Sequence, residues 1–132
     1  MIEEVYISFD TAKMLDGIEF HCVGCYTKNG SVDALDVMNA INNKEKLYPR
    51  LPQSLLARWL REKHGLFIEV MTDFMILSIE NEPTRYYPLF SHKIVNLKDS
   101  SSTKVSKNYS SYEEAHEYGL QEALKLLNVL MK

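Results

Sequence analysis

The clearest repeat of apolar residues lies near the centre of the chain, in "PQSLLARWLREKHG" over residues 52–65. Charged residues fall on one side of a helix drawn through this stretch, and apolar residues fall on the other. The apolar side comprises Leu55, Leu56, Trp59 and Leu60. Pro52 suits the first turn of a helix, and Gly65 suits the position just after its end. The pattern therefore predicts a helix over residues 52–64.

The longest helical pattern lies in the last part of the chain, in "SYEEAHEYGLQEALKLLNVLMK". Ser111 and Glu114 stand three residues apart and match a capping box, in which each side chain accepts a bond from a backbone N–H of the first turn. One face is apolar at helical spacing and comprises Tyr112, Ala115, Leu120, Ala123, Leu127 and Leu130. We therefore predict a helix over residues 111–131.

The first third of the chain is predicted to hold a short helix and then a hairpin. In "SFDTAKMLDG" a serine that suits an N-cap and a glycine that suits a helix end predict a helix over residues 9–16. Asn29-Gly30 is the dipeptide that best supplies the two positive φ angles of a tight hairpin turn. We therefore predict antiparallel arms over residues 19–27 and 31–37, followed by a polar connection to the central helix.

Alternating apolar and polar residues follow the central helix, in "LFIEVMTDFMILSIE". A period of two is typical of strands, and we predict two strands joined at Thr72-Asp73. A third strand is predicted in "RYYPLFSHKIVNL", with Pro88 favouring a position at the sheet edge. The serine-rich stretch that follows has little to bury, which predicts a mobile loop over residues 98–110.

The predicted strand pair carries apolar residues on both of its faces. Phe67, Met71, Phe74 and Ile76 fall on the side that is expected to face solvent. A sheet that is apolar on both faces needs two covers, either helices on each side or another subunit. We interpret these four residues as a possible interaction surface, and covering by the chain's own helices is the alternative.

Together these elements predict an α+β fold: a small, mainly antiparallel sheet packed by two principal helices, with a short helix near the N-terminus. The chain has 132 residues, and its 45% hydrophobic content is ordinary for a globular protein. A chain of this length can bury about two thirds of the surface that its unfolded form exposes. We therefore predict a single domain over residues 1–132.

The charge balance of the chain disfavours binding to nucleic acid and to anionic lipid. The formal net charge is −3, which gives no general attraction to phosphate groups. Arg58, Arg61 and Lys63 could still form a basic face on the 52–64 helix, and weak nucleic-acid binding through this face is an alternative function. A solvated helix surface explains the same residues without any ligand.

The stretch "HCVGCY" contains the only two cysteines, Cys22 and Cys25, beside His21. A structural zinc site needs four ligands, and the remaining histidines lack the spacing of a zinc finger. In an extended strand, residues three apart point to opposite faces, so the two thiols are expected to diverge. We interpret the cysteines as small buried apolar groups and expect no metal or other cofactor; metal binding there remains an alternative.

No pattern of residues in the chain is typical of an enzyme. There is no G-x-S-x-G motif and no glycine-rich phosphate loop. The first ten residues do not read as a secretory signal, and no run of eighteen apolar residues occurs. We therefore predict a protein that is not an enzyme, has no membrane partner and lies in the cytoplasm of a bacterial host cell.

Three blocks of the chain carry a resemblance: "YISFDTAKML", "LLARWLREKHGLFIEV" and "YSSYEEAHEYGLQEALKLL". They resemble successive blocks of a family of small uncharacterised proteins encoded in phages, prophages and mobile elements of gut Bacteroides-type bacteria. The resemblance implies a shared fold but no assigned activity, so no site residues carry over. Our hypothesis is an accessory protein of a phage or mobile element that acts by protein–protein contact, with an unknown partner or as a homo-oligomer.

Overall fold

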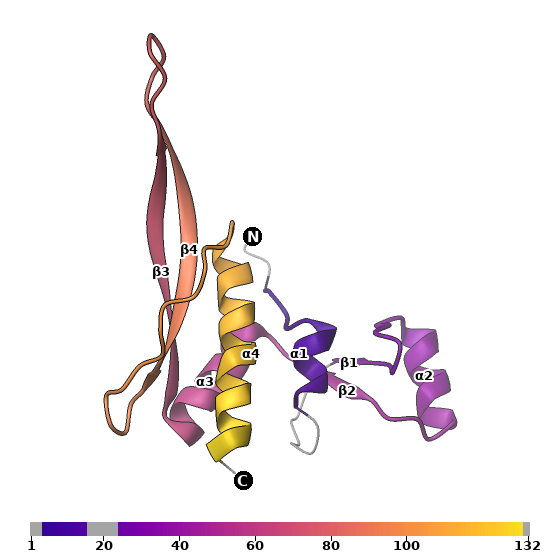
Figure 1. Cartoon of the computed structure of the whole chain (residues 1–132). Coiled ribbons are helices and arrows are strands. Elements are labelled where there is room, and N and C mark those ends of the chain that lie inside the picture. Colours follow the sequence, from indigo (N-terminus) through magenta and orange to yellow (C-terminus); the bar gives the residue numbers. More distant parts are fainter. Residues whose placement is uncertain (1–3, 16–23, 131–132) are drawn as a thin grey trace. The chain divides into compact units, whose positions relative to one another are not determined.

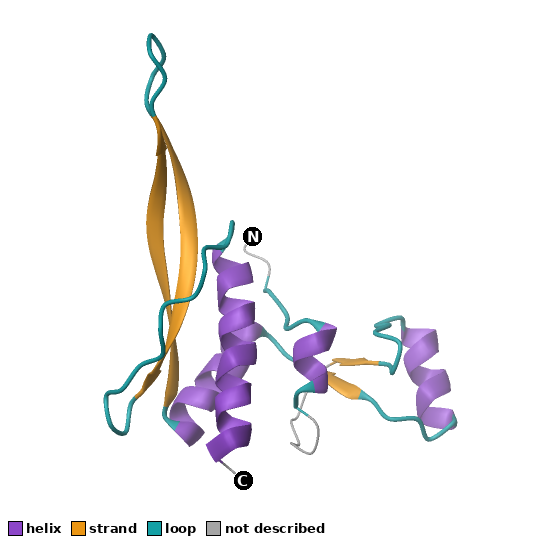
Figure 2. Cartoon of the chain, viewed as in Figure 1, coloured by secondary structure: helices purple, strands orange, loops and turns teal. Residues whose placement is uncertain are grey.

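The structure is a computed structural model that describes residues 4–15 and 24–130. Over these residues it contains four helices and two two-stranded antiparallel sheets, which confirms the predicted α+β class (Figures 1 and 2). The chain divides into two compact units, Met1–Arg58 and Trp59–Lys132. Each unit is described by itself below, and folding as one domain stays a prediction.

The first unit contains two short helices and a small sheet. Its elements are α1 (Phe9–Lys13), β1 (Gly24–Tyr26), α2 (Ala34–Asn42) and β2 (Tyr48–Arg50). Ser8 caps α1 as its residue type predicts, because its Oγ accepts a bond from the N–H of Thr11 at 3.2 Å. The aromatic ring of Phe9 contacts the rings of Tyr26 and Tyr48. These contacts connect α1 to the small sheet.

The predicted hairpin in this unit is wrong. Residues 24–26 pair with β2 in antiparallel register, whereas residues 34–37 belong to α2. A turn is present at residues 27–30, where the N–H of Gly30 donates to the carbonyl of Thr27 at 2.9 Å, and Gly30 has φ 81°, but Asn29 does not have the predicted positive φ. The chain nevertheless enters a helix after it, because the Asp33 carboxylate accepts a bond from the N–H of Leu35 at 2.9 Å and caps α2. Residues 19–23 of the predicted first arm lie outside the described residues.

The central helix, α3 (Gln53–His64), agrees with the prediction in type and length. Leu56 and Leu60 are fully buried on its apolar stripe. Gly65 follows at φ 67°, a conformation that glycine adopts without a steric cost. This glycine lets the chain turn directly from α3 into the first long strand of the second unit.

The second unit is built on a long two-stranded ribbon. β3 (Leu66–Leu77) and β4 (Arg85–Asn96) pair without interruption from Leu66 opposite Asn96 to Leu77 opposite Arg85. The predicted turn at Thr72-Asp73 is therefore wrong, and the third predicted strand is the second arm of one hairpin.

The chain reverses at residues 78–84, where the N–H of Glu82 donates to the carbonyl of Ile79 at 3.1 Å. Asn81 in this turn has φ 66°. Asparagine tolerates that conformation better than threonine or any β-branched residue does, so Asn81 suits this turn.

The long C-terminal helix, α4 (Tyr112–Leu130), covers one face of the lower part of this ribbon (Figure 2). Ser111 caps it as predicted, with its Oγ accepting from the N–H of Glu114 at 3.1 Å. The side chains that it buries are Ala115, Leu120, Ala123, Leu124 and Leu127. Gly119 allows close approach, because a Cβ there would lie 2.6 Å from Cγ2 of Ile68.

Much of the serine-rich segment predicted to be mobile runs along β4. The bonded pairs of backbone groups, donor first, are Phe90–Tyr109, Tyr109–Phe90, Ser106–His92, Thr103–Ile94 and Asn96–Ser101. Hydroxyl groups of Ser106 and Thr103 also accept from the N–H groups of His92 and Ile94. The lower outer edge of β4 is therefore largely covered, and mobility of residues 98–110 stays a prediction.

Candidate protein interface

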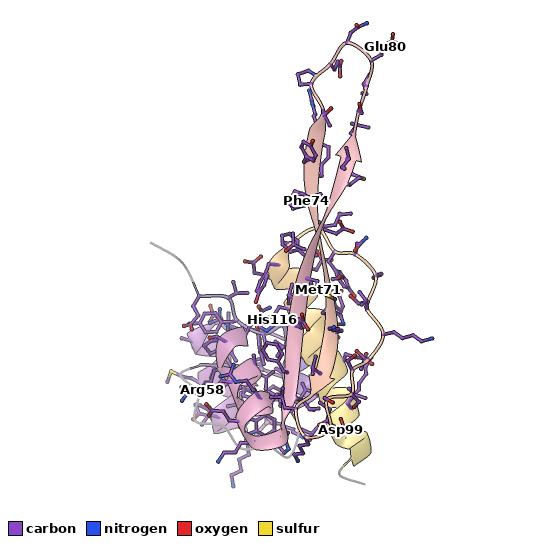
Figure 3. The ribbon with its side chains drawn as sticks, turned by 90° about the vertical axis from the view of Figure 1, so that its left-hand side faces the viewer. Arg58, Met71, Phe74, Glu80, Asp99 and His116 are labelled. Carbon is purple, nitrogen blue, oxygen red and sulfur yellow. The ribbon has the colours of Figure 1, made fainter. Side chains whose placement is uncertain are left out.

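The upper half of the ribbon extends past the N-terminal end of α4 (Figure 1). Every residue from 72 to 88 is exposed, and we call this segment the arm. Figure 3 shows Met71 at the level of α4 and Phe74 beyond it, with Glu80 near the tip. Half of a long hairpin therefore stands without cover from its own unit.

The regular register assigns each arm residue to one of two faces. Ile68 packs towards Gly119 of α4, and strand alternation places Phe74 and Ile76 on the same face. Their register partners, Pro88 and Tyr86, lie on this face too. We call it the α4-side face, and the opposite one, which carries Met75, Leu77 and Tyr87, the outer face.

The four residues that the sequence suggested as one interaction surface do not share a face. Phe67 and Met71 belong to the outer face, beside the part of the ribbon that α4 covers from the other side. Phe74 and Ile76 belong to the α4-side face of the arm. The grouping assumed a turn at position 72, which would have reversed the chain and changed the alternation. One uninterrupted strand separates the two pairs.

A continuous apolar surface follows from this alternation, and we call it the arm patch. It consists of Phe74, Ile76, Tyr86, Pro88, Phe90 and Tyr112. Phe74 exposes 55% of its surface, Ile76 63% and Tyr86 62%. The ring of Phe90 meets that of Tyr112, the first residue of α4, edge to face. The patch thus prolongs the face that α4 buries lower down, and it contains no charged side chain.

Both edges of the arm lack a usable backbone N–H at the same level. Phe90 exchanges bonds with Tyr109 on the outer side of β4, so Phe90 and Thr72 form a non-hydrogen-bonded pair. Two residues further along, Phe74 and Pro88 also form a non-hydrogen-bonded pair, so the backbone nitrogen of each faces an outer edge of the ribbon. The N–H of Phe74 donates to the Asp73 carboxylate at 2.8 Å, and proline has no N–H. Addition of a further strand is therefore disfavoured at either edge.

A second exposed apolar surface lies on α2 of the first unit. Leu35, Met38 and Ile41 stand three residues apart and expose 66%, 60% and 57% of their surfaces. Ala40, on the other side of this helix, is buried. Sequence reasoning missed this surface because it interpreted residues 31–37 as a strand arm and the residues after them as a polar connection. The helical spacing after Asp33 was the signal that could have revealed it.

The basic residues of the alternative function are exposed on α3 but do not form one face. Arg58 and Arg61 are one turn apart, whereas Lys63 lies about 140° around the helix from Arg58. Glu62, also exposed, lies between Arg61 and Lys63 in the sequence. The arrangement lacks the continuous basic stripe that tracking a phosphate backbone requires. Nucleic-acid binding through this helix gains no support from the geometry.

The cysteine stretch is described only in part. Cys25 lies half-buried on β1, while Cys22 and His21 lie outside the described residues. Within the part of the chain that the structure describes, no three His, Cys, Asp or Glu side chains gather as a metal site would require. The interpretation of both cysteines as small apolar groups stays a prediction.

Two histidines are buried where α4 meets β4. Burial lowers the pKa of His92, although a hydrogen bond to the carbonyl of Ala115 and the charge of Glu122 act in the opposite direction. Burial also lowers the pKa of His116; Glu117 and Glu113 oppose this shift, and His92 adds to it. Nδ1 of His92 has no hydrogen-bond partner among the described residues. Both imidazoles are therefore predominantly neutral near pH 7.

A polar pocket of about 410 Å³ lies next to His92, between α4 and the segment along β4. Its lining residues are His92, Thr103, Lys104, Ser106, Tyr109, Tyr118, Gln121, Glu122 and Lys125. The Ser106 hydroxyl accepts from the backbone N–H of His92 and donates to the carbonyl of Lys107. It is thus committed to backbone groups and is not activated by an imidazole, as nucleophilic catalysis would require.

Comparisons of the chain with protein-family models, curated proteins and solved structures find no match. Across the described residues, no helix has both the length and the apolar character needed to cross a membrane. The functional argument therefore depends on the chain's own geometry. The arm is the longest segment of the second unit in which every described residue is exposed.

Proposed function

We propose that this protein acts by binding another protein through the arm, without catalysing a reaction. The observation that carries the proposal is the run of large apolar side chains on a segment in which every residue is exposed. In water-soluble proteins, a contiguous exposed apolar surface of this kind marks an interaction site. Isolated two-stranded ribbons are marginally stable in water, so a partner that covers the arm also stabilises it.

The polar groups of the chain support a role in binding and not in catalysis. The pocket next to His92 contains a serine bonded to backbone and two tyrosines stacked on each other at 5.0 Å. Tyr109 also stacks on His92 at 5.9 Å between ring centres. These contacts hold the 103–109 segment against α4, and they give Ser106, His92, Tyr109 and Tyr118 a role in the fold. Function as an accessory protein of a phage or mobile element stays a prediction from the resemblance.

Photocrosslinking tests the proposal directly. A benzophenone-bearing amino acid replaces Ile76 in the chain, expressed in the cells that naturally encode it. Because Ile76 exposes 63% of its surface on the arm, we expect irradiation to give one dominant protein adduct, identified by mass spectrometry.

The matched control carries the same amino acid in place of Val105, which is 57% exposed in the same unit but lies off the arm. We expect no adduct there. Absence of any adduct at position 76, or an equal yield at both positions, would show that the arm is not the binding element.

A further inference from the structure

We propose that the pocket next to His92 binds a small carboxylate that also carries hydroxyl groups, of the chemical class of a sugar acid. The pocket lies wholly within the second unit, and its lining residues run from His92 to Lys125, outside the arm. The proposal therefore goes beyond the proposed function and does not depend on it. A pocket of about 410 Å³ falls within the range that small-molecule sites occupy.

One imidazole of the pocket has an unpaired nitrogen. His92 lines the pocket and exposes only 6% of its surface, and its Nδ1 has no hydrogen-bond partner among the described residues. Nearly all buried polar groups of folded proteins have a partner, either in the protein or in what is bound to it. A neutral imidazole has one nitrogen that donates and one that accepts. A hydroxyl group can bond to either nitrogen, so we expect the ligand to carry hydroxyl groups.

The charged groups of the pocket come from both of its walls. Lys104 lies on the segment along β4, whereas Glu122 and Lys125 lie one turn apart on α4. None of these three side chains forms an ion pair with another residue that the structure describes. Two ammonium groups and one carboxylate leave the lining with one net positive charge, in a chain whose net charge is −3. A local charge of this sign favours an anionic ligand.

Glu122 restricts which anion suits the pocket. Its charge acts on both His92 and Tyr109, so its carboxylate lies near the imidazole. A carboxylate accepts hydrogen bonds and repels anions, and it therefore favours hydroxyl groups beside it. We expect the charged end of the ligand to lie near the two lysines and its hydroxyl groups near Glu122 and His92. One carboxylate matches a single net positive charge better than the nearly doubly charged phosphate monoester does.

An NMR titration of nitrogen-15-labelled protein tests the proposal. The probes are glucuronate and gluconate, and each comparison compound lacks one feature: glucose lacks the carboxylate, and cyclohexanecarboxylate lacks the hydroxyl groups. We expect at least one acid to shift the amides of Ser106 and Glu122 saturably, with a dissociation constant of about 1 mM, because so small a ligand gains little free energy. Both comparison compounds are expected to bind at least about tenfold more weakly. Long-range nitrogen–proton spectra are expected to show a shift of His92 Nδ1.

A pair of lysine variants separates the pocket from general attraction of anions. Lys125→Gln removes one ammonium group at an exposed position, so the variant is expected to fold and to bind the acid at least about fivefold more weakly. Lys93→Gln is the matched control. Lys93 belongs to the same unit and pairs with Glu69 at 3.6 Å, but it does not line the pocket. We expect its dissociation constant to stay within about twofold of wild type.

Four outcomes overturn the proposal. They are shifts that stay absent or unsaturated up to about 20 mM of either acid, equal binding of glucose, equal weakening in Lys93→Gln, and tighter binding of glucose 6-phosphate than of the acids. The first outcome leaves ordered water as the partner of Nδ1. Crosslinking at position 76 is unaffected by any of them, so the proposed function of the arm stands or fails separately.

Discussion

At the scale of single residues, the buried histidines connect stability to pH. His92 and His116 are each less than a tenth exposed, and burial lowers the pKa of both. In the unfolded chain each has a pKa of about 6.5. The folded state therefore holds them neutral at pH values at which the unfolded state already binds protons. Their stabilisation is complete above about pH 6.5 and is lost as the pH falls towards the lowered folded values.

We predict that the free energy of unfolding decreases between pH 7.5 and 5.5, by at most about 1.4 kcal/mol per pH unit for each histidine. Urea unfolding at several pH values in this interval measures the slope. His116→Gln removes one titrating group, so its slope is expected to be shallower than that of wild type. A wild-type profile that is flat over the interval would contradict the burial argument.

At the scale of elements, local signals predicted α1, α3 and α4, missed α2, and predicted turns poorly. The caps at Ser8 and Ser111 and the stripe of α3 depend on neighbours within one or two helical turns, and all three are present in the structure. Asn29-Gly30 does turn the chain, but which partner β1 finds depends on a strand more than twenty residues away.

The arm was misread for a related reason. Nothing in the alternation of β3 limits its length, and twelve residues exceeds the usual strand. Phe67, Phe74 and Ile76 are exposed as expected, whereas Met71 is half-buried. The faces of all four depended on the position of the turn, which period-two alternation does not encode.

The contact between α4 and the ribbon gives a prediction at this scale. An alanine Cβ at position 119 would lie 2.6 Å from Cγ2 of Ile68 and 3.3 Å from the ring of His92. Overpacking costs about 1–3 kcal/mol, whereas alanine gains up to about 1 kcal/mol over glycine as a helix former. Gly119→Ala is therefore expected to lower the free energy of unfolding in urea.

Gly24→Ala is the control for this substitution, because the nearest atoms to its new Cβ lie 3.9 Å away or more. We expect that it changes the free energy of unfolding by less than about 1 kcal/mol. If Gly119→Ala is as stable as wild type, the close approach of α4 to β3 at this point is wrong.

At the scale of the whole molecule, stability is expected to be uneven. The base of the ribbon is held on one face by α4 and along the β4 edge by the 101–109 segment. The arm has only the bonds between its two strands. Regions with few buried apolar contacts open with a smaller free energy than a covered core does.

Hydrogen exchange on the monomer tests this gradient. We predict that the amides of Thr103, Ser106 and Tyr109 exchange at least about a hundredfold more slowly than unprotected amides, because each donates to a carbonyl of β4. The arm amides are expected to exchange faster than those of the base. Rapid exchange across residues 98–110 would instead support the mobile loop that their composition predicts.

The paired interruption at Phe74 and Pro88 bears on how crowded molecules behave. Amyloid growth needs an unbroken row of backbone donors and acceptors along a strand, repeated from chain to chain. Here a carboxylate already occupies the donor on one side of the ribbon, and an imino acid removes it on the other. The row of backbone donors is thus interrupted on both edges at the level of the exposed apolar side chains, which disfavours the seeding of fibrils there.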